Sequence, residues 1–313
     1  MRTRTDSKPH VLILMGGPDA EREVSLHSGE EVAAALRSTN KFIVTEQVID
    51  RPNAGELAQF NCDVIFPALH GTWGEGGGLQ RELDKLNIPY VGSQPGPAAL
   101  AMDKVLTKNM LAPLDVPTPP AQILTVGDSC TIEPPVVLKP VDDGSSVDLY
   151  ICRNYSDILR ACDKLFAKRT RIMAESYIKG REITVGVLLG TLLPLIEIVP
   201  AVEFYDYDAK YERSDTQYRF DPQLPAGVAD QCNRIAQTAF DALGCRDIAR
   251  VDIMVNDAGP WFLEINTMPG FTTHSLVPMA AAHVGIPMAE LCAKLVEAAL
   301  ARTPQSAATA TST

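Results

Sequence analysis

The sequence predicts an α/β protein of more than one domain that begins with a parallel, doubly wound sheet. At 313 residues the chain has room for two or three domains. Over roughly the first hundred residues, short apolar runs alternate with segments of helical spacing, the pattern that produces parallel strands with crossover helices. Residues 248–266 instead have the pattern of a β-hairpin. These observations together indicate different sheets at the two ends of the chain.

The expected elements follow from the periodicity of apolar residues. In the first part we expect strands at 10–15, 63–69 and 88–91, and helices at 30–37 and 79–86. A helix around 102–111 then precedes a β-rich unit with apolar runs at 136–139, 172–175 and 183–189. Further on we expect a strand near 193–199, a polar loop at 204–220, and helices at 228–243 and 288–299. The expected domains are residues 1–103, 104–187 and 188–302, with a disordered tail at 303–313.

Composition excludes several classes of partner. The net charge of −11 argues against nucleic acid, which needs a basic surface. The seven cysteines are scattered without a CxxC pair, which indicates reduced thiols in a cytoplasmic protein. The first ten residues lack the apolar run of a signal peptide, and no run reaches transmembrane length, so we expect no membrane partner.

The hairpin at residues 248–266 predicts a metal site. With a three-residue turn centred on Ala258, Asp252 pairs with Glu264 and Arg250 pairs with Asn266. Side chains two residues apart share a face of a strand, so all four lie together. Two carboxylates and an amide carbonyl suit Mg²⁺ shared with substrate phosphates. The alternative is a hairpin with a polar outer face, but its apolar neighbours favour the metal.

Several other segments are ambiguous when taken alone. Lys139 ends an apolar strand before a Gly-Ser-Ser turn, where it could hold phosphates, but an exposed loop explains it better. Lys104 could be a solvated helical charge. His70 opens a glycine-rich loop at the end of a strand, either a ligand loop or a flexible connection. Glu21 also follows a strand, and it could simply be an acid favoured at a helix N-terminus.

Two later loops have the composition of binding segments. Residues 269–278 place a glycine and small hydroxyl residues before a helix, an arrangement suited to a carboxylate or oxyanion. Residues 203–211 place Lys210 and Tyr211 in a long polar loop of the kind that serves as a lid.

The order of these motifs resembles the D-alanine–D-alanine ligases of the ATP-grasp superfamily. The matching segments are GGPDAEREVSLHSG, FPALHGTWGEGGGLQ, IPYVGS, AMDKVLTK, LKPVDDGSSV, EFYDYDAKY, ARVDIMV and FLEINTMPGFTTHSLVP. The resemblance covers roughly residues 10–302. It implies a three-domain ATP-grasp architecture, in which a parallel doubly wound N-terminal sheet precedes two α+β domains that grip ATP.

The resemblance also implies a role for each matching residue. Glu21 would bind the ammonium group of the first D-alanine, with His70 close by. Ser145 and Tyr211 would hydrogen-bond with Glu21 to latch the lid. Arg250 and the backbone of Gly270 would stabilise the oxyanion. The residues implied for the carboxylate of the second D-alanine are Ser275 and Leu276, those for ATP are Lys104, Lys139, Glu175, Tyr177, Ile178, Glu182 and Lys210, and those for two Mg²⁺ or Mn²⁺ ions are Asp252, Glu264 and Asn266.

The implied reaction joins two D-alanine molecules for peptidoglycan precursors. The γ-phosphoryl group of ATP activates one carboxylate as an acyl phosphate, the second amine displaces phosphate, and D-alanyl-D-alanine, ADP and phosphate result. Relatives are commonly homodimers, so a homodimer is expected. The alternatives are a D-alanine–D-serine or D-alanine–D-lactate ligase, or a catalytically silent nucleotide-binding homologue. Tyr211 argues against D-lactate.

Three positions depart from the family pattern. Asp148 follows GSSV where the family usually has glycine, and Gly76 stands where an acid is usual. Ser176 replaces a lysine that many relatives carry beside adenine. These departures bear on nucleotide affinity, because the set of catalytic residues is complete.

Overall fold

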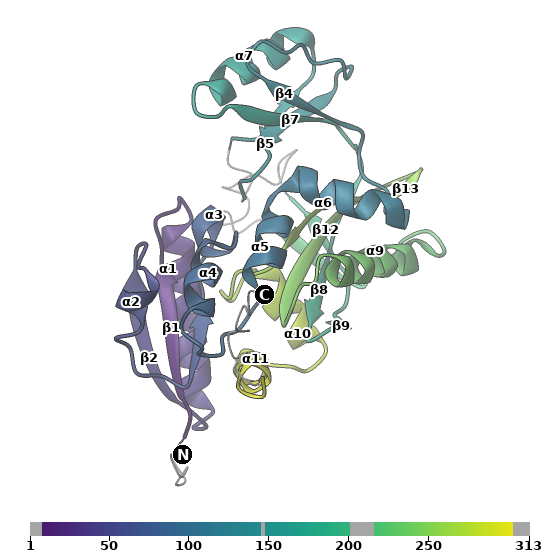
Figure 1. The fold of residues 1–313 in the computed structure, drawn as a ribbon. Helices are drawn as coiled ribbons and strands as arrows, with labels where there is room; N and C mark the ends of the chain where they lie inside the picture. Colours follow the sequence, from purple (N-terminus) through teal and green to yellow (C-terminus); the bar gives the residue numbers. More distant parts are fainter. Residues whose placement is uncertain (1–7, 145–147, 201–215, 303–313) are drawn as a thin grey trace, which may run out of the picture.

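Three separate sheets organise the computed structural model, which describes residues 8–144, 148–200 and 216–302. Their strand orders are β2-β1-β3, β4-β7-β5-β6 and β11-β10-β8-β12-β13, with β9 paired to β8. The four-stranded sheet lies apart from the other two, with its helix on the outside (Figure 1). Mixed α/β layers with a parallel first sheet confirm the predicted fold class.

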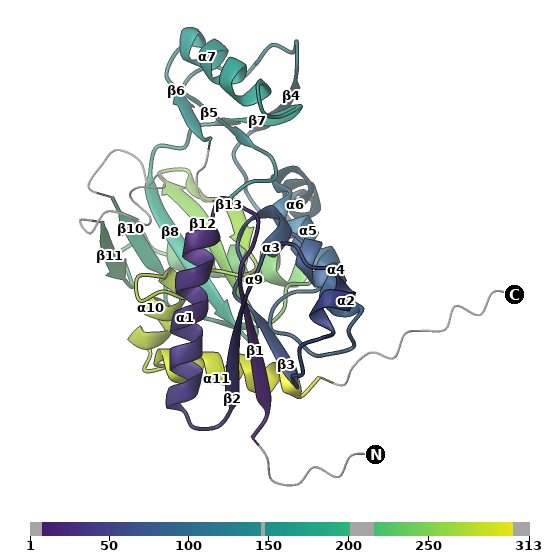
Figure 2. The same ribbon diagram turned by 90° about the vertical axis from the view of Figure 1, so that its left-hand side faces the viewer.

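The first sheet is parallel, as predicted. Its strands are β1 (His10–Gly16), β2 (Ile43–Ile49) and β3 (Val64–Pro67), and its helices are α1 (Arg22–Ser38), α2 (Ala54–Leu57), α3 (Gly71–Gly74) and α4 (Gly78–Asp84). β1 is buried along almost its whole length because helices cover both of its faces. Figure 2 shows α1 on one side of β1, with α2 and α4 on the other. The strand expected at 88–91 is reduced to one bridge between Tyr90 and Ile65.

A glycine sets the distance between α1 and the first sheet. A Cβ atom on Gly29 would lie 2.6 Å from Sδ of Met15 in β1, so a larger residue would push the helix away. This close packing fixes the N-terminal end of α1, where Glu21 and Arg22 lie, relative to the end of β1.

The helix expected around 102–111 is present from residue 104, and a second helix that was not predicted lies directly before it. They are α5 (Pro95–Met102) and α6 (Lys104–Leu111), followed by the 3-10 turn η1 (Ala112–Leu114). Asp103 causes the break, because its carboxylate accepts hydrogen bonds from the N–H groups of Val105 and Leu106, at 2.9 and 3.0 Å, and so caps α6. The prediction missed a strong N-cap signal. As a result Lys104 becomes the first residue of a helix.

The second sheet is antiparallel and carries one amphipathic helix. Its elements are β4 (Ala121–Thr125), β5 (Val136–Pro140), β6 (Tyr150–Cys152), α7 (Tyr155–Phe166) and β7 (Arg171–Ser176). The core of this unit joins β5 and β7 to the buried face of α7.

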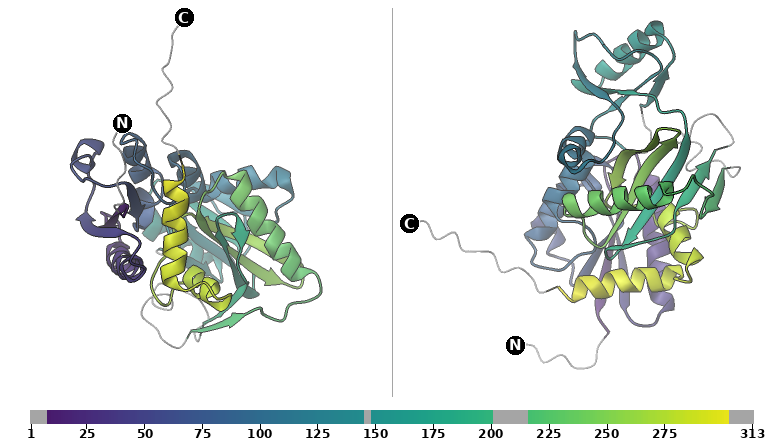
Figure 3. Two further views of the ribbon diagram at one scale, coloured as in Figure 1. Left: turned by 90° about the horizontal axis from the view of Figure 1, so that it is seen from below. Right: turned by 90° about the vertical axis from the view of Figure 1, so that its right-hand side faces the viewer.

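The third sheet forms the floor of the site and carries five of the predicted site residues, namely Glu182, Arg250, Asp252, Glu264 and Asn266. Its strands are β8 (Arg181–Leu188), β9 (Thr191–Leu192), β10 (Ile196–Val199), β11 (Gln217–Phe220), β12 (Ile248–Asn256) and β13 (Gly259–Asn266). The helix α9 (Val228–Ala242) covers one face, as Figure 3 shows. The expected boundary between residues 187 and 188 falls inside β8, which pairs along its length with β12 in this sheet.

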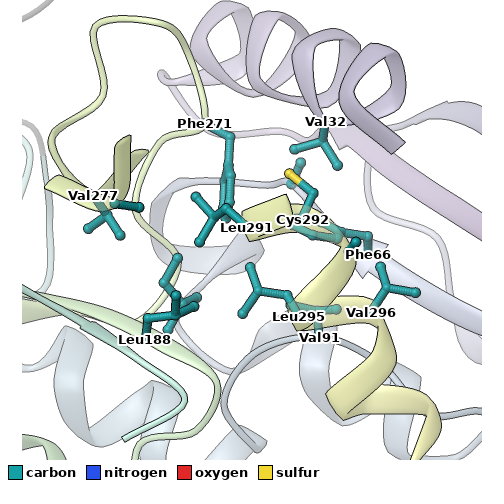
Figure 4. Packing of buried hydrophobic residues seen from close by; sticks show 14 of the residues in the cluster. Val32, Phe66, Val91, Leu188, Phe271, Val277, Leu291, Cys292, Leu295 and Val296 are labelled. Atoms are coloured by element: carbon teal, nitrogen blue, oxygen red, sulfur yellow. The ribbon is translucent and has the colours of Figure 1, made fainter. Parts of the chain in front are cut away.

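The last two helices join the first sheet to the third. They are α10 (Leu276–His283) and α11 (Met288–Leu300). Leu291, Leu295 and Val296 of α11 pack in one buried cluster with Phe66 of β3 and Leu188 of β8 (Figure 4). Seen from below, α11 runs between the two sheets (Figure 3). This continuous core fixes the N-terminal unit against the third sheet.

The hairpin has the predicted pairing at its functional end but a different turn. Arg250 pairs with Asn266 and Asp252 with Glu264, as expected. The register then shifts, and the strands meet at Asn256 and Gly259, which leaves a two-residue turn. The side-chain oxygen of Asn256 accepts from the N–H of Ala258 at 3.0 Å and so stabilises the shorter turn. A β-bulge at residue 263 restores the pairing, because one strand carries one extra residue.

None of the helices in the described ranges is by itself long and apolar enough to cross a membrane, although the bent pair α10 and α11 passes that test by length and composition.

Candidate active site

Two adjoining cavities lie where the three sheets meet. The first lies among the N-terminal unit, α5 and the third sheet, and the second between the second and third sheets. Every predicted site residue that the structure describes lines one or both of them; Ser145, Lys210 and Tyr211 lie outside the described residues. The residues common to both cavities are Lys104, Asp143, Gly144, Glu182, Ile198, Asp252 and Glu264.

The floor carries the predicted metal ligands in adjacent rows. Asp252 pairs with Glu264 on one side and with Thr184 of β8 on the other. The Thr184 hydroxyl donates to Asp252 at 2.8 Å. The Arg250 guanidinium donates to the same carboxylate through Nε at 3.0 Å and Nη2 at 2.8 Å. Asp252 is therefore held rigidly, with a cation beside it.

Lys104 joins the hairpin to the second sheet. Its ammonium lies 3.1 Å from the Glu264 carboxylate and donates to the carbonyl of Asp143 at 2.6 Å. Burial alone would lower the pKa of Lys104, but Glu264 and Asp143 outweigh it and raise that pKa above its ordinary value. The side chain is therefore a fixed positive charge between the two cavities, as an anionic ligand requires.

The second cavity contains a buried charge cluster that the sequence did not reveal. Glu175 lies between the ammonium groups of Lys139, at 2.6 Å, and Lys108. Burial alone would raise the pKa of Glu175, but the two lysines lower it below its usual value. Lys108 also donates to the carbonyl of Pro119 at 3.1 Å. The sequence feature that could have pointed to Lys108 is its position four residues after Lys104, on the same face of α6.

Part of the wall of the second cavity is apolar. It is formed by Tyr177 and Ile178 from one side and by Met254 and Leu263 from the floor. Because of the bulge, Leu263 and Glu264 are both partly exposed although they are consecutive in the strand. Glu182 lies across from Met254 in the next strand. A flat apolar ligand such as a purine fits between these side chains, with charged groups at its lysine-lined end.

In the first cavity, His70 is the centre of a buried hydrogen-bond chain. Its Nδ1 lies 3.1 Å from the carbonyl of Met268, which can only accept, so Nδ1 carries the proton. Nε2 therefore accepts from the Ser28 hydroxyl at 3.2 Å, and the Ser28 oxygen accepts from the N–H of Phe271 at 3.2 Å. Burial lowers the pKa of His70 to about 4, so the ring is neutral at pH 7. Sequence reasoning did not identify Ser28.

This chain of hydrogen bonds holds the loop that carries Gly270. A Cβ atom at Gly270 would lie 2.7 Å from Oγ of Ser275, so there is no room for a side chain. Ser275 itself accepts from the N–H of Thr272 at 2.9 Å and precedes the first residue of α10, Leu276. The loop before α10 therefore brings Gly270 and Ser275 to the wall of the first cavity, while the binding role predicted for residues 269–278 stays a prediction.

Two carboxyl groups face each other across the first cavity. Both Glu21 and Glu75 are buried. Burial, followed by the charge of Glu21, raises the pKa of Glu75 well above its usual value. Glu21 also lies close to the second sheet, because a Cβ atom on Gly144 would be 3.5 Å from its carboxylate.

The three departures from the family pattern have structural settings. At Gly76 a Cβ atom would lie 2.3 Å from the carbonyl oxygen of Thr72, so this backbone path requires glycine. Ser176 lines the second cavity. Asp148 forms ion pairs with Lys168 and Arg169, at 3.0 and 2.9 Å.

Comparison with known proteins matches this architecture. The family model described as the D-ala D-ala ligase C-terminus matches residues 126–297, and the one for the N-terminus matches residues 47–93. The chain belongs to the D-alanine–D-alanine ligase family. It is 40% identical to the D-alanine–D-alanine ligase of Hydrogenovibrio crunogenus, over 93% of this chain and 94% of the relative. It is 42% identical to that of Bordetella pertussis, over 92% and 95%.

Solved structures of this ligase family have the same fold. The D-alanine–D-alanine ligase of Bacillus anthracis complexed with ATP superposes with a TM-score of 0.83 at 32% identity, covering 94% of this chain and 98% of that one. The D-Ala:D-Ser ligase VanG of Enterococcus faecalis superposes with a TM-score of 0.80 at 24% identity, over 93% and 99%. The second likeness concerns the fold alone.

Proposed function

We propose that this protein is an ATP-dependent ligase that joins two molecules of D-alanine and releases ADP and phosphate. The observation that carries the proposal is the extent of the family match, about 40% identity across more than nine-tenths of the chain. The two cavities support it, because one has the form of a nucleotide site and the other collects polar and charged groups beside it. Its product would enter peptidoglycan synthesis in the cytoplasm, and we expect a homodimer.

The first cavity would hold both amino acids. The Glu21 carboxylate is placed to bind the ammonium group of the first D-alanine, with the neutral His70 ring beside it. The small side chain of Ser275 and the backbone at Leu276 would receive the carboxylate of the second. Both D-alanine molecules would then lie next to Lys104, at the junction with the nucleotide cavity.

The second cavity would hold ATP. The base would pack between Ile178 and Leu263, with Glu175 and Tyr177 at its polar edge and Glu182 at the ribose. Lys139 lines this cavity and Lys104 lines both cavities, which supports the proposal that these two lysines bind the phosphates. This placement brings the γ-phosphoryl group toward the carboxylate of the first D-alanine.

The chemistry then proceeds in two steps. The carboxylate oxygen of the first D-alanine attacks the γ-phosphorus, ADP leaves, and an acyl phosphate forms. The neutral amine of the second D-alanine attacks the carbonyl carbon, and phosphate leaves from the tetrahedral intermediate. Arg250 and the N–H of Gly270 would stabilise the oxyanion of that intermediate. The lysines would neutralise charge that develops during phosphoryl transfer.

The floor of the cleft fits a divalent cation. Asp252, Glu264 and Asn266 offer two carboxylates and an amide carbonyl, all oxygen donors. The described residues hold no group of three or more His, Cys, Asp or Glu side chains placed for a metal. The phosphates of ATP would therefore complete the coordination of Mg²⁺ or Mn²⁺, which would supply charge neutralisation for the transferred phosphoryl group.

Phosphate release from ATP tests the proposal. With ATP and Mg²⁺ present, adding D-alanine should raise phosphate release at least tenfold, and D-alanyl-D-alanine should accumulate in equal amount. D-serine and D-lactate, each offered with D-alanine, distinguish the related ligases by the mass of the product. ADP formation at the same rate without D-alanine would reject the ligase, and nucleotide binding without turnover would favour the silent homologue.

A further inference from the structure

Arg169 connects the two acidic residues on either side of residues 145–147. Its guanidinium forms an ion pair with Asp143 through Nη2 and with Asp148 through Nη1, the latter at 2.9 Å. Lys168 adds a second cation to Asp148, at 3.0 and 3.1 Å from its two oxygens. Arg169 follows α7 in the chain, where its N–H donates to the carbonyl of Leu165 at 2.9 Å. It therefore extends from a fixed helix end.

Asp148 has an unusual backbone conformation beside this contact. Its φ is +55°, in the left-handed region of backbone conformation that residues other than glycine rarely adopt. Asp148 stands where the family usually has glycine. Burial would raise the pKa of Asp148, but its hydrogen bonds and ion pairs with Lys168 and Arg169 lower it, so the carboxylate is ionised. The strained backbone is therefore accompanied by two ion pairs that glycine could not form.

Asp143 carries this contact into the site. Its carbonyl accepts the hydrogen bond of Lys104 at 2.6 Å, and Lys104 lies 3.1 Å from Glu264. The preceding residue is fastened on the other side, because the hydroxyl of Thr72 donates to the carbonyl of Asp142 at 3.1 Å. Asp143 also lines both cavities, at the junction where the phosphates of ATP are proposed to bind.

We propose that Arg169 is a positioning residue for ATP, which holds Asp143 against Lys104 and neutralises its carboxylate beside the nucleotide phosphates. The inference rests on the proposed function. The planar guanidinium suits this task, because its separate N–H groups reach two carboxylates at once, which a single ammonium does less well.

The effect should fall on ATP more than on D-alanine. Without Arg169, the Asp143 carboxylate would lose its ion pair and place more negative charge beside a ligand whose phosphates are strongly anionic. D-alanine carries no net charge as a zwitterion, so the same carboxylate repels it far less. A role confined to folding would instead alter stability and leave the ratio of the two KM values unchanged.

Steady-state kinetics of Arg169→Gln test the inference. The KM for ATP should rise about 5- to 10-fold, while the KM for D-alanine stays within about twofold. Arg160→Gln is the matched control, since Arg160 is an exposed arginine of α7 that pairs with Asp157 at 2.5 Å. That control should behave as the unaltered enzyme, with thermal unfolding of all variants recorded alongside.

Asp148→Asn provides a second variant if Arg169→Gln does not fold. It removes one carboxylate from the guanidinium and should raise the KM for ATP about two- to threefold. An unchanged KM for ATP in folded Arg169→Gln, or equal rises for both substrates, would overturn the inference while the ligase activity stands. An unaltered enzyme that does not turn over ATP with D-alanine would refute the proposed function instead.

Discussion

Ser28→Ala removes the hydroxyl at the centre of the hydrogen-bond chain beside the proposed oxyanion site. Ser28 is fully buried on α1, where it donates to Nε2 of His70 and accepts from the N–H of Phe271, both at 3.2 Å. Alanine fits the same space, so the variant removes these two bonds without crowding its neighbours.

The magnitude follows from what is left unpaired. A buried polar group without a partner costs about 1–3 kcal/mol, and two such groups remain, on His70 and Phe271. Both lost bonds are long, so the lower part of the range applies. We expect the free energy of unfolding to fall by about 2–3 kcal/mol. Gly270 directly precedes Phe271, so loss of the Ser28 contact should also displace the N–H of Gly270, the proposed oxyanion donor. We therefore expect kcat to fall by about tenfold.

Urea unfolding and phosphate release measure the two effects. Ser38→Ala is the matched control on the same helix, because Ser38 is exposed and its hydroxyl donates to the carbonyl of Ala35 at 2.7 Å. The control should change the free energy of unfolding by no more than about 0.5 kcal/mol. If Ser28→Ala is as stable as Ser38→Ala, the hydrogen-bond chain does not hold the loop and the reasoning fails.

Three further changes test other parts of the site. Glu264→Ala should lower turnover roughly a hundredfold or more while the protein still folds, since it removes a proposed metal ligand, with some loss of stability because Lys104 loses its ion pair; retained activity would contradict that role. Lys108→Met should lower the free energy of unfolding by about 3 kcal/mol, because Glu175 keeps only one lysine, and adding Glu175→Gln should recover part of the loss; strict additivity would argue against the pair. The folded-state pKa of His70, about 4, lies below its ordinary 6.5. Protonation of His70 therefore favours the unfolded state. The contribution of the neutral ring to the free energy of unfolding is fully present above about pH 6.5 and is lost as the pH falls toward 4. His70→Gln should remove about 3 kcal/mol of that pH dependence in urea titrations, and parallel curves for both proteins would refute it.

Local patterns located the elements that have continuous apolar runs or helical stripes, because periodicity is read directly from neighbouring residues. They did not predict β2, β4, β6 or α7, and β11 lies inside the polar loop expected at 204–220. The apolar run of β1 and the stripe of α11 were both located within a few residues. The helix α5 was missed because its apolar residues are not confined to one face and so give no helical stripe. The strand at 88–91 was overestimated because a short apolar run does not specify a pairing partner.

The site was predictable where ligands lie on one hairpin, and much less so where they meet through folding. The pairing of Asp252 with Glu264 was predicted from a three-residue turn, and the two-residue turn together with the bulge at residue 263 gives the same register. The contacts of Ser28 with Phe271 and of Arg169 with Asp143 join residues far apart in the sequence, which no local pattern specifies. The roles of Ser275 and Leu276 came from resemblance alone and stay predictions.

The extra residue in β13, Leu263, lets the strand contribute to the wall of the second cavity without changing the pairing of Glu264 with Asp252. If Leu263 were deleted, a plain hairpin with the same two-residue turn would still place Glu264 opposite Asp252, so the pair of acids does not depend on the bulge. What the bulge adds is one more side chain on the wall of the nucleotide cavity. An enzyme built this way can exchange that side chain, and with it the fit around the base, while the arrangement of its oxygen ligands stays the same.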